Sequence, residues 1–191
     1  HRAKLLDGTA VVVKLRRPGI VAKVEADLRI LNHVARLMEM ELPESRRYRP
    51  IQIVGQLRRS LRGELDLIRE ARNIDVFARH FKNDPTVHIP RVFWEYSGEI
   101  VNVQEELRGI PGTELDAARA QGMDLSLLAA RGADVVLKMI LIHGHYHADP
   151  HPGNVMYLSD NRIGILDFGM VGRLTDTRRD QITNFLGALI R

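Results

Sequence analysis

The chain has 191 residues, 45% hydrophobic and 5% aromatic, with no cysteine and a formal net charge of +4. Its length and apolar content suffice for a packed core, and the lack of cysteine excludes disulfides and thiolate metal sites. The small positive charge favours anionic partners such as nucleotides or a membrane surface, whereas so few aromatic side chains argue against a nucleic-acid partner.

The start of the chain predicts a hairpin followed by a helix. Residues 1–6 and 9–15 are strand-like and flank Asp7-Gly8, a dipeptide suited to a tight turn. Apolar residues then recur at helical spacing over residues 20–40. Because the sequence begins with His rather than Met and opens directly on a strand, we expect a fragment of a longer protein.

The next segments predict a long, highly charged helix and a second hairpin. Apolar residues recur every three or four positions from Ile53 to Phe77, with Gly63 as a weak interruption. Residues 92–96 and 100–105 then read as strands around a Ser-Gly turn.

The C-terminal part is predicted to be mainly helical with one small hairpin. A mostly apolar helix is expected over residues 127–143, short strands over 155–158 and 162–166, and a last helix over 176–190 with Thr175 as its cap. No apolar run is long enough to cross a bilayer, and no signal peptide is visible.

This order of elements predicts an α+β fold with two lobes. We expect residues 1–107 to form the first lobe and residues 108–191 to begin the second, joined near Leu107 to Gly112. A ligand would then bind in the cleft between them.

Three polar residues of the second lobe are spaced as in a magnesium-phosphate site. Asn154 follows Asp149 by five positions, and Asp167, in Asp-Phe-Gly, follows Asn154 by thirteen. A protein-kinase catalytic loop precedes its metal-binding Asp-Phe-Gly by this spacing. We therefore predict Asn154 and Asp167 as metal ligands, and Asp149 as the catalytic carboxylate that orients a hydroxyl or water.

Lys14 is the candidate phosphate-binding and catalytic cation, because a lone ammonium ends the apolar strand Val11-Val-Val-Lys14. Glu70 is its expected partner, with Asp66 four positions earlier on the same helix face; Glu64 would point elsewhere. A solvated lysine and an exposed row of carboxylates paired with arginines are the alternatives.

Two residues near the lobe junction are candidates for contact with the adenine. Glu105 ends the second predicted hairpin where a hinge would pass the base, and Leu107 begins the joining segment. Backbone groups usually make such contacts, so the role of the Glu105 side chain stays open. His147 is expected to brace the catalytic turn by hydrogen bonding.

These motifs, with the run His147-Ala-Asp-Pro-His-Pro-Gly-Asn154, resemble the UbiB (AarF) family of atypical protein-kinase-like proteins over nearly the whole chain. The resemblance implies a kinase-like fold that binds ATP and Mg²⁺, and activity as an ATPase or as a small-molecule or lipid kinase. It makes Glu64 and Asp66 the family's acidic pair beside the cofactor.

The resemblance also implies a role in ubiquinone or other lipid metabolism, with a quinone precursor or lipid as partner. The expected location is the cytoplasmic side of a membrane, the bacterial inner membrane, reached through segments outside this chain, or the cytoplasm for this fragment alone. A nucleotide loop and a Lys-x-Gly-Gln segment would precede His1.

Two other functions compete with this one. His145, His147, Asp149 and His151 nearly reproduce the ligand pattern of metallo-β-lactamase-like zinc hydrolases, although no histidine follows to complete two zinc shells. A catalytically silent kinase-like scaffold is the other alternative, although such proteins commonly lose one of the motif residues that are all present here.

Overall fold

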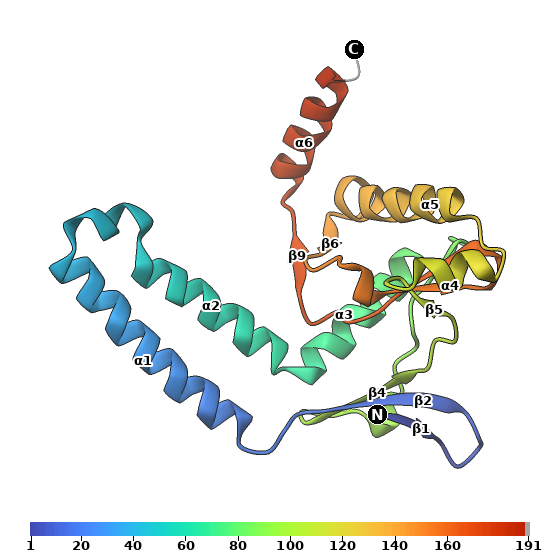
Figure 1. The fold of residues 1–191 in the computed structure, drawn as a ribbon, viewed down its shortest axis with the longest axis horizontal. Coiled ribbons are helices and arrows are strands. Elements are labelled where there is room, and N and C mark those ends of the chain that lie inside the picture. The colour runs from blue at the N-terminus through green and yellow to red at the C-terminus, as the bar shows by residue number, and fades with distance from the viewer. Residues whose placement is uncertain (190–191) are drawn as a thin grey trace.

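The computed structural model describes residues 1–189 of the chain (Figure 1). Its α-helices are α1 (Ile20–Glu41), α2 (Pro50–Glu64), α3 (Leu67–His80), α4 (Leu115–Ala120), α5 (Leu125–Leu137) and α6 (Asp176–Leu189). Its strands are β1 (Arg2–Lys4), β2 (Ala10–Leu15), β3 (Val87–His88), β4 (Val101–Glu105), β5 (Ile110–Pro111), β6 (His145–His147), β7 (Val155–Leu158), β8 (Arg162–Ile165) and β9 (Val171–Arg173). Within this part of the chain, no helix combines the length and apolarity needed to span a membrane.

An antiparallel sheet in the order β1-β2-β4 carries the start of the chain. The predicted first hairpin is confirmed: Gly8 takes the positive φ, and the Asp7 carboxylate accepts the Thr9 N–H at 2.9 Å. In the β2–β4 ladder Lys14 lies opposite Asn102, so both side chains point to the same face of the sheet.

Helices α1 and α2 form an arm that packs mainly on itself and projects from the body of the molecule (Figure 1). The first predicted helix is confirmed. The single helix predicted over 53–77 is wrong, because the chain breaks between α2 and α3 at Leu65-Asp66. Asp66 has φ −97° and ψ 87° and caps α3 by accepting the Arg69 N–H at 2.9 Å. The apolar period continues across this break, which hides it in the sequence.

The second predicted hairpin is wrong in its first strand. Residues 92–96 contribute one isolated bridge, Val92 with Gln104, and a 3₁₀ turn over Trp94–Tyr96. Ser97 closes this loop: its hydroxyl donates to the Phe93 carbonyl at 2.9 Å and accepts the Val103 N–H at 3.0 Å. The predicted second strand does form, as β4, and pairs with β2.

A second sheet, in the order β3-β8-β7-β5, lies in the C-terminal part. The predicted hairpin of β7 and β8 is confirmed, with Asp160 and Asn161 of its turn at positive φ. Strand β3 joins this sheet parallel to β8, although it comes from residues predicted to belong to the first lobe. The lobe boundary at residue 107 stays a prediction.

The main hydrophobic core lies between α3, α5 and this second sheet. Phe77 and Phe168 are fully buried in it, with ring centroids 5.0 Å apart. Helix α5 ends earlier than predicted, and a π-helical turn over Lys138–Ile142 follows it. Helix α6 begins where predicted, with Thr175 Oγ1 accepting the Arg178 N–H at 3.3 Å; its predicted end at Ile190 lies outside the described residues.

Candidate nucleotide and metal site

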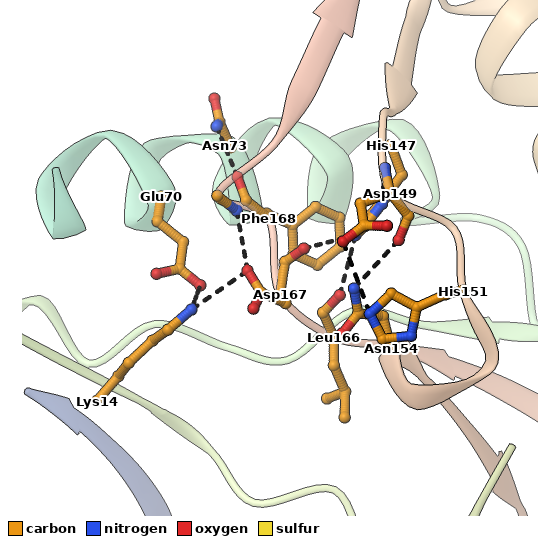
Figure 2. A network of polar contacts seen from close by, with 11 residues as sticks. Lys14, Glu70, Asn73, His147, Asp149, His151, Asn154, Leu166, Asp167 and Phe168 are labelled. Atoms are coloured by element: carbon orange, nitrogen blue, oxygen red, sulfur yellow. Dashed lines mark hydrogen bonds and ion pairs between the residues drawn. The ribbon is translucent and has the colours of Figure 1, made fainter. Parts of the chain in front are cut away.

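Lys14 of β2 lies between two carboxylates from different parts of the chain. Its Nζ is 2.7 Å from Glu70 Oε1 on α3 and 3.2 Å from Asp167 Oδ1 (Figure 2). The Glu70 side chain is only 2% exposed, whereas those of Lys14 and Asp167 are each more than a third exposed. The structure thus brings together three predicted residues that are far apart in the sequence.

Burial and charge act in opposite directions on this group. Burial alone would lower the pKa of Lys14, but the carboxylates of Glu70 and Asp167 outweigh it and raise that pKa. Burial raises the pKa of the Glu70 carboxyl, and the Lys14 ammonium offsets this only in part. The lysine therefore stays charged across the physiological pH range.

The turn that carries Asp167 is held from both sides. Asp167 has φ 54°, a left-handed conformation that Asp tolerates better than most residues, and its Oδ1 accepts the Gly169 N–H at 3.2 Å. His147 Nε2 approaches the carbonyls of Leu166 and Asp167 at 3.1 and 2.5 Å. On the other side, Asn73 Nδ2 of α3 donates to the Phe168 carbonyl at 2.8 Å.

The catalytic loop is tied together by its own backbone and side chains (Figure 2). The Asp149 carbonyl accepts hydrogen bonds from His151 N at 2.9 Å and from Asn154 Nδ2 at 3.1 Å. Because the Asn154 amide donates through its nitrogen, its Oδ1 is left to face a cation. The Asp149 side chain is exposed, and its Oδ2 lies 3.6 Å from His151 Nε2.

A cavity of about 360 Å³ opens beside this group, and Lys14, Glu70, Asp167, Glu105 and Leu107 are among its lining residues. The Glu105 carboxylate is already engaged by His88 Nε2, at 3.0 and 3.1 Å, and by the Arg91 N–H at 3.1 Å. A larger cavity of about 570 Å³ behind the catalytic loop is mainly apolar; Asn154 lines both cavities, but none of these five residues lines the larger one.

The predicted acidic pair splits at the break between α2 and α3. Glu64 ends α2, and its carboxylate lies so close to Gly169 that a Cβ there would be 2.9 Å from Glu64 Oε1. Burial raises the pKa of Glu64, and the carboxylates of Asp167, Glu70 and Asp149 raise it further against the opposing effect of Lys14. Asp66 instead caps α3 and does not line the 360 Å³ cavity.

The structure does not support the hydrolase alternative, because the histidine run does not converge on one point. His147 uses both ring nitrogens: Nδ1 accepts the Asp149 N–H, and Nε2 donates to carbonyl oxygens. His151 Nδ1 accepts the Gly153 N–H, and the His145 ring stacks on His80. No group of three or more His, Asp or Glu side chains within residues 1–189 is arranged to hold a metal ion.

The remaining oxygen donors suit Mg²⁺. Asp167 contributes a carboxylate and Asn154 an amide oxygen, which are the hard ligands that Mg²⁺ takes when phosphates complete its shell. The carboxylates of Asp167, Glu70 and Asp149 all lie close enough to raise the pKa of Glu64, and the Lys14 ammonium opposes them. This excess of negative charge favours a divalent cation at the site.

Sequence reasoning missed three polar residues of this region. Asn73 lies three positions after Glu70, hence on nearly the same side of α3. Asn102 is fully buried and Gln104 nearly so, and Gln104 lines the 360 Å³ cavity. The signal was available: two amides at alternate positions of an apolar strand share one face.

Comparison with known proteins identifies the family of this chain. The family description of the ABC1 atypical kinase-like domain matches residues 1–191. The chain belongs to the ABC1 atypical kinase-like family. The predicted resemblance and the predicted kinase-like α+β fold are thereby confirmed.

Relatives of this ABC1 domain carry the name "Probable protein kinase UbiB". Those of Cellvibrio japonicus and Azotobacter vinelandii are 37% and 36% identical over 195 residues, covering 100% of this chain but 35% and 36% of the relatives' length. The solved structure of Rv3197 from Mycobacterium tuberculosis, a complex with erythromycin, has a TM-score of 0.69 at 28% identity. It covers 91% of this chain and 43% of that one.

Proposed function

We propose that this ABC1 domain binds Mg-ATP in the 360 Å³ cavity and belongs to an atypical kinase or ATPase of the UbiB type. The observation that carries the proposal is the placement of Lys14 Nζ, which bridges Glu70 and Asp167 at the cavity wall. A fixed ammonium beside a potential metal ligand is what a triphosphate needs. Kinase-like relatives of the same family support this assignment.

In this proposal, different residues contact different parts of the nucleotide. Lys14 binds phosphate oxygens, and Glu70 keeps the lysine in place from α3. Backbone groups of Glu105 and Leu107 other than the Glu105 N–H, which donates to the Arg91 carbonyl at 2.8 Å, would contact the adenine, because the Glu105 carboxylate is occupied elsewhere. Glu64 adds a carboxylate beside Gly169, at the edge of the phosphate site.

Asn154 and Asp167 would hold Mg²⁺, which supplies charge neutralisation on the transferring phosphoryl group. The exposed Asp149 carboxylate orients the attacking hydroxyl or water and accepts its proton. Its loop is fixed by hydrogen bonds to the Asp149 carbonyl, so the backbone that carries the carboxylate is in place before any substrate arrives.

The physiological setting is a further part of the proposal. Family membership and the UbiB name of the relatives favour a role in ubiquinone biosynthesis or lipid metabolism, with a quinone precursor or lipid as partner. Such partners favour action at the cytoplasmic face of a membrane, reached by segments outside this chain.

The test is ATP turnover by the full-length protein with Mg²⁺. We expect Asp167→Asn to abolish turnover nearly completely, because the amide keeps the shape of the side chain but loses the charge that binds metal. Asp160→Asn is the matched control, since Asp160 lies on the exposed β7–β8 turn at a positive φ that Asn tolerates.

Unchanged turnover in Asp167→Asn would contradict the proposal. Nucleotide binding without turnover in the wild-type protein would instead favour the silent scaffold. Turnover lost equally in Asp160→Asn would show that folding, and not the metal site, had been damaged.

A further inference from the structure

Asn73 makes a contact with the metal-binding turn that none of the nucleotide roles above requires. It is half-buried on α3, one turn after Glu70, and its Nδ2 donates to the Phe168 carbonyl at 2.8 Å (Figure 2). One helix thus reaches the site twice, through Glu70 to Lys14 and through Asn73 to the turn that carries Asp167.

The Phe168 carbonyl belongs to the same peptide unit as the Gly169 N–H. A peptide unit is planar, so an interaction that fixes its carbonyl also fixes the direction of its N–H. The Gly169 N–H donates to Asp167 Oδ1 at 3.2 Å, and this same oxygen lies 3.2 Å from Lys14 Nζ. A single rigid peptide therefore connects the Asn73 amide to the orientation of the Asp167 carboxylate.

Within residues 1–189, the other contacts of the turn hold groups other than the Phe168 carbonyl. The Phe168 ring is fully buried, with centroids 5.0 Å from Phe77 and 5.4 Å from His147. Its packing holds the side chain, and the His147 hydrogen bonds hold the two preceding carbonyls. Rotation of the peptide between Phe168 and Gly169 stays open to glycine, which tolerates φ values closed to other residues.

We infer that Asn73 is a positioning residue for the metal site: it holds the Phe168–Gly169 peptide so that its N–H orients the Asp167 carboxylate. Without the Asn73 donor, the peptide is free to turn, and Asp167 loses the hydrogen bond that directs Oδ1 toward Lys14. Because Glu70 and Asn73 share α3, a movement of this helix releases the lysine and the metal ligand together. The inference rests on the proposed binding of Mg-ATP.

The test compares two leucine variants of the full-length protein. Asn73→Leu removes the donor at similar size, and Asn73→Ala is the second variant, needed if the first fails to fold. Asp75→Leu is the matched control on the same helix, since the Asp75 carboxylate accepts the Trp94 Nε1–H at 2.8 Å, remote from the metal-binding turn. The readouts are nucleotide affinity without metal, the Mg²⁺ concentration for half-maximal nucleotide binding, and the thermal midpoint.

We expect the Asn73 variants to need about tenfold more Mg²⁺, the size of effect that one lost hydrogen bond produces, with metal-free affinity within about twofold of wild type. Asp75→Leu is expected to lower the thermal midpoint without changing the Mg²⁺ requirement. An unchanged Mg²⁺ requirement in both Asn73 variants, or an equal rise of that requirement in Asp75→Leu, would overturn the inference but leave the proposed function standing. Absence of Mg²⁺-dependent nucleotide binding in the wild type would instead overturn the proposed function, and the inference with it.

Discussion

The Lys14 strand and the catalytic loop face the same cavity but are held in place differently. Lys14 is positioned by charge, through Glu70 at 2.7 Å and Asp167 at 3.2 Å, and so depends on where α3 lies. The loop from Asp149 to Asn154 is positioned by hydrogen bonds to its own backbone. The loop is therefore preset, whereas the position of Lys14, the proposed phosphate ligand, is adjustable.

The largest expected effect comes from removing the charge of Lys14. Lys14→Met should weaken nucleotide binding about ten- to hundredfold, because it removes a charged donor to phosphate. It should also lower the free energy of unfolding by about 2 kcal/mol, because Glu70 is left as a buried, unpaired carboxylate. Urea unfolding and nucleotide titration measure the two effects separately.

The control for this prediction is the double variant Lys14→Met with Glu70→Leu. Removing the stranded carboxylate should restore most of the stability while nucleotide binding stays weak. If stability did not recover, burial of Glu70 would not be the reason for the loss. If binding recovered, Lys14 would not be the phosphate ligand.

A smaller effect separates the two members of the acidic pair. Asp66→Ala should lower the free energy of unfolding by about 1 kcal/mol through loss of the cap on α3, whereas Asp66→Asn should be nearly neutral because Asn caps equally well. Thermal denaturation checks both variants. Weaker nucleotide binding in Asp66→Asn would show that its charge, and not only its cap, serves the site.

The smallest expected effect is a pH dependence of stability that arises from three histidines near the start of the catalytic loop. His80, His143 and His145 stack, with ring centroids 4.3 Å apart for His80 and His143 and 5.4 Å for His80 and His145. Burial lowers the pKa of all three. The neighbouring histidines lower the pKa of His80 and His143 further, and Arg79, Lys138 and Arg173 add to the effect.

The sign follows from proton binding. Folded imidazoles with lowered pKa values bind fewer protons than the unfolded chain, so stability is fully present above the ordinary pKa of 6.5 and falls as pH drops below it. Melting temperatures between pH 7.5 and 5 check this. His145→Phe keeps an aromatic ring without a titrating group and should flatten the curve; an equal slope in this variant would contradict the prediction.

The residues of the site were largely predictable, because their chemistry is unusual for their surroundings. Lys14 stands on an apolar strand, and the spacing from Asp149 to Asn154 to Asp167 fixes a loop and a turn. A helix period was enough to select Glu70 as the partner of Lys14, and the structure places the two 2.7 Å apart.

The break between α2 and α3, the shortened strand near residue 92 and the role of Asn73 were not predictable in the same way. The apolar period runs on across Leu65-Asp66, so it could not reveal that Asp66 prefers to cap a new helix. The strand predicted at 92–96 keeps only the bridge from Val92 to Gln104, because a turn over Trp94–Tyr96, closed by the hydrogen bonds of Ser97, follows it. Asn73 escaped because one amide on a helix carries no distinctive spacing.

The parallel pairing of β3 with β8 bears on how this molecule can be dissected. Val87 and His88 pair with Ile163 and Gly164, so one edge strand of the C-terminal sheet comes from the chain before the predicted hinge. A polypeptide starting at Arg108 would leave that edge uncovered and the core without Phe77, conditions that promote aggregation. We therefore expect that the two halves do not fold separately, and that exchanging either one between relatives would require α3 and β3 to move with the C-terminal half.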